Sequence, residues 1–325
     1  MIRISVAVLA VLLCCSLPVA VSAEGFLPGM PSFGGWSCAP VHKTNCSVAG
    51  WLGYLGYSRG LVFERGTVGP PNPGGVDTVR YQYPVEGIWL AASAAISGPK
   101  VGFAAYEPGE GLCLLLGASW LFPNNKQATE TVNGAGGPGA RTWSPTIQWY
   151  TLEAAVSRCS VQNFSLIGGF RYDSFSTKFA DPVPVADFAA STSGDEAELN
   201  LTSYIPYVGA VTKWGAVEVG VIGFPWVPGA IEQRQTIGGS AVRYVTTGNY
   251  RNAYFLETWA EVGRQLGIVN LSAFATYTVL HAVGEFDFIR NPIAGASESA
   301  PNNFGLDRQN WIAGGKAMIG FNSPL

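Results

Sequence analysis

The residues of this sequence that could do acid–base chemistry centre on His281, one of two histidines in the chain. A histidine that acts as a general base needs a nucleophile or an orienting carboxylate within hydrogen-bond reach. Ser272 and Glu285 are its candidate partners. If this segment is an extended strand, however, Glu285 lies about 13 Å from His281. The sequence therefore predicts a structural or solvated role for His281 and a protein that is not an enzyme.

The cysteines could form a disulfide or bind a metal. Cys38 and Cys46 lie in a stretch rich in glycine and proline, and an oxidising compartment favours a disulfide between them over free thiols. Cys113 and Cys159 fall in predicted strands, where we expect small apolar fillers. The chain has no CxxC motif and no cysteine–histidine ligand set, so we expect neither zinc nor any other cofactor.

The N-terminus has the pattern of a secretory signal peptide. Arg3 is followed by the apolar run Val6–Leu13 and by the small residues Val21-Ser22-Ala23. We predict a signal peptide over residues 1–23 and an irregular segment rich in glycine and proline over 24–75. That segment would be a plug, a lid or a periplasmic part, and within it Trp51–Phe63 would be either a first strand or part of an N-terminal lid. Residues 76–325 would form the folded domain.

The composition is unusual for a water-soluble domain. Charged residues make up 13% of the chain, against roughly 25% in ordinary soluble domains, and the mean hydropathy is +0.20. The formal net charge is −3, which argues against a nucleic-acid partner. The mature chain has no apolar run of the roughly 20 residues that a transmembrane helix needs. Only helices and closed barrels can span a bilayer, so an exported apolar chain of this kind favours a barrel.

The segments that must position these residues alternate with a period of two. In Ser165–Phe175, one face carries Leu166, Phe170 and Tyr172, and the other carries Arg171 and Asp173. Such alternation is typical of β-strands with one apolar and one polar face. Many segments run for 12 to 18 residues, whereas strands of soluble proteins usually have about 5 to 6. We predict an all-β, antiparallel, up-and-down transmembrane barrel of about ten strands, within a range of 8 to 12.

The alternation assigns side chains to the two faces of this barrel. Residues on the apolar stripes and near strand ends are predicted to face lipid or to form aromatic girdles: Leu166, Phe170, Tyr172, Leu201, Ile205, Tyr207, Trp226, Trp311, Ile319 and Phe321. Charged residues on the opposite faces are predicted to face the lumen: Arg171, Asp173, Glu257 and Glu261.

With these features the chain resembles the porin-like outer-membrane β-barrel proteins of Gram-negative bacteria. The resemblance covers about Val76–Phe321 and includes the hairpin Ser203–Gly229 and the closing strand GGKAMIGF. It implies the outer membrane as location, with membrane lipid and the barrel-assembly machinery as partners. The family's barrels usually end on an aromatic residue, whereas this chain continues for four residues after Phe321.

Three functions follow from these observations. The first is an integral outer-membrane barrel with a structural, narrow-channel or small-solute role, since a barrel of this size has little open lumen. The second is a barrel enzyme that acts on lipid or peptide, and the third is a soluble secreted β-sandwich that binds a ligand. The sequence leaves the oligomeric state open.

Overall fold

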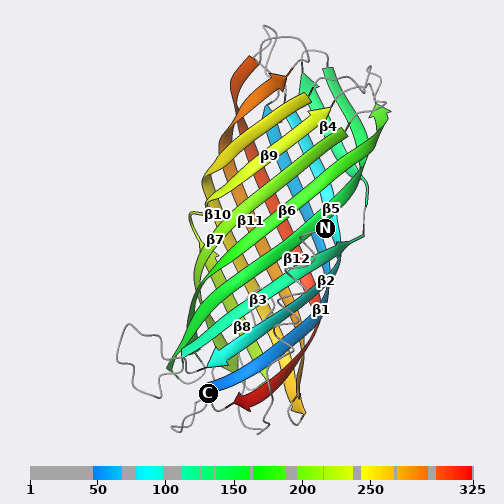
Figure 1. Ribbon diagram of the computed structural model, residues 1–325. Helices are drawn as coiled ribbons and strands as arrows, with labels where there is room; N and C mark the ends of the chain where they lie inside the picture. The colour runs from blue at the N-terminus through cyan, green and yellow to red at the C-terminus, as the bar shows by residue number, and fades with distance from the viewer. Residues whose placement is uncertain are drawn as a thin grey trace.

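The computed structural model is a single antiparallel β-sheet that closes on itself as a long, tilted barrel (Figure 1). It describes residues 47–67, 78–97, 112–124, 126–134, 137–161, 164–186, 196–214, 216–236, 243–266, 269–291 and 298–323. No helix within these ranges is long and apolar enough to cross a membrane. The signal peptide, Cys38 and Cys46 lie outside the described residues.

Twelve strands make up the described part of the wall. They are β1 (Ser47–Thr67), β2 (Thr78–Ser97), β3 (Leu112–Pro123), β4 (Ala128–Gly134), β5 (Gly137–Val161), β6 (Phe164–Ala186), β7 (Glu196–Trp214), β8 (Val217–Phe224), β9 (Gly229–Thr236), β10 (Arg243–Leu266), β11 (Val269–Asn291) and β12 (Glu298–Ser323).

These strands occupy ten positions around the barrel. β3 and β4 lie end to end in one position, between β2 and β5. β8 and β9 likewise lie end to end in one position, between β7 and β10. Strands that follow one another around the wall pair antiparallel, and β1 closes the ring by pairing with both β2 and β12. The prediction of an up-and-down barrel of about ten strands is confirmed, and the alternative of a two-layer sandwich is wrong.

One predicted boundary is also wrong. β1 lies inside the segment 24–75 that we expected to be irregular, and it forms a full strand of the wall. The barrel therefore begins at or before Ser47 rather than at residue 76. Of the two alternatives left open for Trp51–Phe63, a first strand is confirmed and part of a lid is wrong.

Candidate functional site: the filled interior and the two halves of the wall

The outer face of β6 changes from apolar to polar part-way along the strand. We call the end where β6 begins the lower end and the end where it finishes the upper end, as in Figure 1. From the lower end, its outward side chains are first apolar and then polar: Phe164, Leu166, Phe170 and Tyr172, followed by Ser174, Ser176 and Lys178.

The inner face of β6 changes in the opposite sense. Its buried side chains are first mainly polar and then mainly apolar: Ser165, Ile167, Arg171 and Asp173, followed by Phe175, Thr177 and Phe179. The lower half of this strand thus has an apolar outside and a polar inside. The upper half has a polar outside and an apolar core, as a soluble protein has.

Neighbouring strands repeat this reversal. On β5 the outer face is apolar at Leu152 and Val156 and polar at Thr146 and Gln148. On β7 the outward side chains from the upper end are first polar and then mainly apolar: Glu198, Asn200 and Thr202, followed by Tyr204, Pro206, Val208 and Ala210. We call the apolar lower outer surface the belt and the upper half the shaft.

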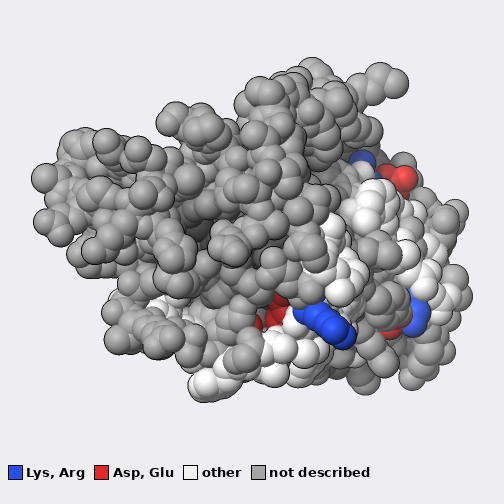
Figure 2. Space-filling model, turned by 90° about the horizontal axis from the view of Figure 1, so that it is seen from below, with Lys and Arg blue, Asp and Glu red and all other residues white. Residues whose placement is uncertain are grey.

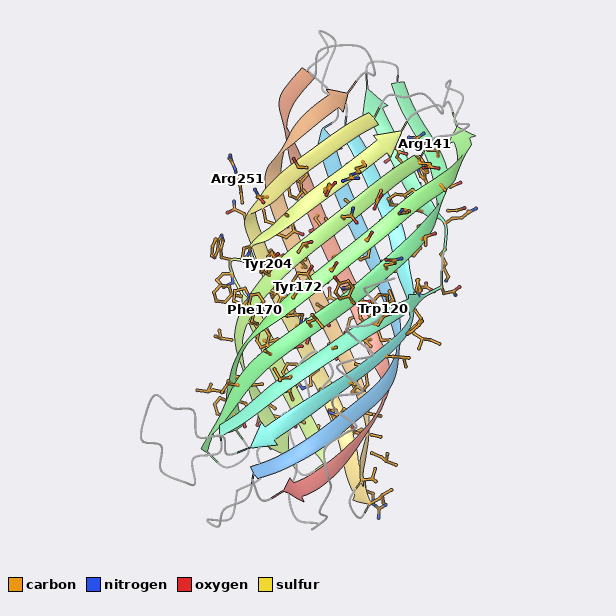
Figure 3. The ribbon with its side chains drawn as sticks, in the orientation of Figure 1. Trp120, Arg141, Phe170, Tyr172, Tyr204 and Arg251 are labelled. Atoms are coloured by element: carbon orange, nitrogen blue, oxygen red, sulfur yellow. The ribbon has the colours of Figure 1, made fainter. Side chains whose placement is uncertain are left out.

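Aromatic side chains mark the boundary between belt and shaft on each of these strands. The rings of Trp120, Tyr150, Tyr172 and Tyr204 follow one another across four neighbouring positions, with centroids 5.4, 6.1 and 5.6 Å apart. Figure 3 shows the labelled members of this row near mid-height of the barrel. On the far side, Tyr277 and Trp311 lie 4.3 Å apart. An aromatic row at one height is typical of a membrane–water interface.

The belt has the height of a bilayer core. On β6 it runs for nine residues, from Phe164 to Tyr172. Nine residues span about 30 Å of strand, which at the usual barrel tilt of about 40° gives about 23 Å of height. Transmembrane strands need about 9 to 11 residues, so the belt fits one crossing and the shaft is additional.

A charged cluster fills the interior at the level of the upper belt. The guanidinium of Arg171 on β6 donates to both carboxylate oxygens of Glu257 on β10, at 3.0 and 3.2 Å. Its Nε also lies 3.5 Å from Glu153 on β5. Thr278 donates to Glu257 at 2.9 Å, and the hydroxyl of Tyr207 donates to Glu153. Such bidentate pairing compensates charges that would be costly to bury alone.

A second ion pair joins opposite walls. Arg308 on β12 pairs with Asp173 on β6, and these strands lie five positions apart in the ring of ten. The Asp173 carboxylate also accepts a bond from the indole of Trp149 at 2.6 Å. Arg308 stacks over the same indole, 4.3 Å from its centroid. This contact crosses the lumen, so side chains from opposite walls meet at this level.

The described interior of the shaft is mainly an apolar core, with a polar cluster near its top. Trp143, Phe175, Phe179, Leu199 and Leu306 are all buried there. Above them, Arg141 donates to Glu130 at 2.5 and 3.2 Å, near the upper end in Figure 3. Trp143 donates to the same carboxylate at 2.6 Å.

The lower interior contains a further ion pair. Lys316 on β12 pairs with Glu261 on β10, and Glu218 on β8 accepts a bond from the Trp259 indole at 3.5 Å. In the view from below, the described side chains in sight include both acidic and basic groups among uncharged ones (Figure 2). The described part of this face therefore shows no patch of a single sign.

Substitution of two adjacent glycines on β6 can test how tightly this interior is packed. A Cβ on inward-facing Gly169 would lie 2.5 Å from the ring and hydroxyl of Tyr207, whereas on outward-facing Gly168 its nearest neighbour would be 3.9 Å away. We expect Gly169→Ala to displace Tyr207 from Glu153 and to lower the free energy of unfolding by about 1–3 kcal/mol. Gly168→Ala is the matched control and should leave urea unfolding unchanged. Equal midpoints for both variants would contradict this packing.

The structure places the predicted lumen residues Arg171, Asp173, Glu257 and Glu261 inside the barrel. Of the predicted outer residues, four are exposed or partly exposed on the outer side: Leu166, Phe170, Tyr172 and Trp311. Trp226 is also exposed, but it lies in the connection between β8 and β9. Ile319 and Phe321 belong to β12, and their side chains lie outside the described ones.

The prediction is wrong for three of the residues expected on the outer face. Leu201, Ile205 and Tyr207 on β7 point inward and are 2%, 0% and 2% exposed. The upper half of this strand belongs to the shaft, so its apolar face packs in the core, and its outer face turns from polar to apolar only where the belt begins. The alternation therefore located the strand correctly but assigned its faces the wrong way round.

His281 has a partner that the sequence analysis missed. Its Nδ1 lies 2.5 Å from a carboxylate oxygen of Asp307 on β12, not near Glu285, and its ring stacks on Tyr254 at 5.2 Å. All three side chains are on the outer side of the wall, just above the aromatic row. Val279 and Val283 flank His281 on the same face of β11. The spacing in the sequence does not reveal this pair, because its members are 26 residues apart and meet only through the register between β11 and β12.

Comparison with known proteins identifies the architecture. Neither a scan against protein-family models nor a search of curated proteins finds a match. Among solved structures, the chain is similar to the outer membrane protease OmpT from Escherichia coli, with a TM-score of 0.65 and 9% identity over 86% of this chain and 98% of that chain. The translocator domain of the autotransporter NalP from Neisseria meningitidis gives a TM-score of only 0.31, at 12% identity over 82% of this chain and 88% of that chain. At such identities a likeness concerns the fold alone, and the chain accordingly has the architecture of a bacterial outer-membrane β-barrel protein.

Proposed function

We propose that this protein is an integral outer-membrane barrel with a closed lumen, whose belt lies in lipid and whose shaft projects beyond the outer leaflet. Its role is structural: it holds the upper connections away from the membrane on a rigid stem. It has no enzymatic activity and needs no cofactor. The barrel-assembly machinery and the surrounding lipid are its partners.

The reversal of both faces of the wall at the aromatic row carries this proposal. A barrel in water throughout would have a polar outer face along its whole length, and one in lipid throughout would be apolar outside along its whole length. A wall that is apolar outside for about one bilayer and polar outside beyond it fits a half-inserted barrel. Four of the five upper connections have six to ten residues, and three of the four lower ones have two; the exceptions are 135–136 at the upper end and 98–111 at the lower end. The predominance of longer connections favours the upper end as the external one.

The filled interior supports a closed rather than a conducting barrel. Arg171–Glu257 and Arg308–Asp173 span the lumen, and aromatic side chains pack above them. We expect the purified protein to show no stepwise conductance in planar bilayers, to fractionate with membranes and to shift its gel mobility on heating. Regular conductance steps would contradict the closed lumen. Recovery in the aqueous fraction without detergent would contradict insertion itself.

A hydrolase that acts on lipid or peptide is the second candidate, favoured by the His281–Asp307 pair alone. A carboxylate that orients a histidine is half of a general-base system. The flanking valines offer no nucleophile, so a bound water would have to serve. Loss of a hydrolytic activity in His281→Ala would establish this function in place of the structural one.

A further inference from the structure

In the part of the wall that the structure describes, two places are interrupted, and both interruptions begin with a Phe-Pro pair. One follows Phe122 on β3 and the other follows Phe224 on β8. Proline has no N–H group to donate to the neighbouring strand, so it ends the ladder of hydrogen bonds. Both breaks lie next to the aromatic row: Phe122 is two residues beyond Trp120, and the backbone N–H of Tyr204 donates to the Pro228 carbonyl at 2.8 Å.

The interruption after β8 reverses the side of the wall that its residues face. Phe224 pairs with inward-facing Phe255, so unbroken alternation would turn Trp226 inward and Val227 outward. Instead, Trp226 is 60% exposed and Val227 is 1% exposed. The N–H of Val227 donates to the Ala253 carbonyl at 3.0 Å, which holds this reversed arrangement against β10. The break therefore directs an indole away from the lumen at the boundary of the belt.

The interruption after β3 covers a carboxylate on the outer side of the wall. Glu86 alternates with outward-facing Ile88 and Leu90, yet it is buried. The ammonium group of Lys126, within the interruption, lies 2.5 Å from the Glu86 carboxylate. The N–H of Asn124 donates to the Glu86 carbonyl at 2.7 Å. This break thus shields and neutralises a charge at the level where the belt ends.

We propose that these two interruptions fix the depth of the barrel in the membrane by contact with the lipid headgroup layer. Trp226 sits in that layer, where an amphipathic indole is most stable, and Lys126 keeps the Glu86 carboxylate from facing lipid unpaired, which would be costly. This role of the interruptions rests on the proposed insertion of the belt. It is favoured by the position of both breaks at the aromatic row, continuous with the belt below.

The first experiment measures the depth of Trp226. The full-length protein is placed in phospholipid vesicles whose chains are brominated either near the headgroup or near the chain ends, because bromine quenches indole emission on contact. The emission of Trp226 is obtained by subtracting the emission of Trp226→Phe from that of the unchanged protein. We expect lipids brominated near the headgroup to quench this emission several-fold more than lipids brominated near the chain ends. Trp143→Phe is the matched control, since its indole lies in the core of the shaft and should not be quenched.

Two outcomes would overturn the role of Trp226: emission that neither lipid quenches, or emission that the chain-end lipid quenches more. Exposed Trp214 and Trp311 distinguish such a result from failure of insertion. If the barrel is not in the bilayer at all, the total emission of the unchanged protein also stays insensitive to both lipids.

The second experiment tests the interruption after β3. We expect Lys126→Met to lower the urea midpoint of the vesicle-bound protein and Glu86→Gln in the same chain to restore it. Lys178→Met is the control, because Lys178 lies 3.9 Å from Glu198 on the exposed surface of the shaft. An unchanged midpoint in Lys126→Met would overturn this part of the proposal.

Discussion

Arg308→Ala is expected to lower the free energy of unfolding by about 3–5 kcal/mol, the usual cost of removing one partner of a buried ion pair. The variant leaves the Asp173 carboxylate buried in the lumen with the Trp149 indole as a neutral donor. It also removes the stacking of the guanidinium on that indole. The contact joins strands on opposite sides of the ring, so its loss removes a link across the lumen rather than a link between neighbouring strands.

Urea unfolding in detergent micelles, with the heat-dependent gel shift as its readout, measures this loss of stability. The double variant Arg308→Met with Asp173→Leu is the control, because replacing both charges by apolar groups of similar size removes the unpaired carboxylate. It should recover most of the lost stability. A single variant as stable as the unchanged protein would show that the pair does not close the lumen.

Gly168→Arg is expected to destabilise the inserted barrel by about 2–4 kcal/mol, the cost of a basic side chain near the middle of the bilayer on the outer face of a transmembrane barrel. Gly168 faces outward midway along the belt, four residues from both Phe164 and Tyr172 on β6, and a Cβ there would have its nearest neighbour 3.9 Å away. An arginine there would have to reach past half of the belt to find water.

Ser176→Arg on the same strand is the matched control. Ser176 also faces outward, but four residues beyond Tyr172, on the shaft. We expect its substitution to leave the urea midpoint in lipid vesicles within experimental error. Equal losses at both positions, or a loss at Ser176 alone, would place the membrane boundary elsewhere than at the aromatic row.

The predictions that depended only on local patterns agree with the structure. A period of two along Ser165–Phe175 and similar segments predicted strands, because successive side chains point to opposite faces whatever the strand packs against. The low content of charged residues and the lack of apolar helices predicted a closed sheet. Strand length together with alternating short and long connections predicted neighbouring antiparallel strands and about ten positions around the ring.

The predictions that required knowledge of the surroundings failed or could not be made. Alternation along β7 located an apolar stripe but could not show that this stripe faces the core of the shaft rather than lipid, so it could not show that Leu201 and Ile205 point inward. The partner of His281 depends on the register between β11 and β12, which local sequence does not encode. Trp226 was predicted to face outward and is exposed, but the break that turns it there by shifting the alternation by one residue was not predicted.

The sequence by itself thus determined that the chain forms long amphipathic strands and that such strands must close, because period and composition act within each segment. Only the tertiary structure decided which face is inside, which charges meet across the lumen, and where the outer surface turns from apolar to polar. Those properties depend on distances between residues far apart in the chain. Ring closure and strand register set these distances, and no single strand determines either of them.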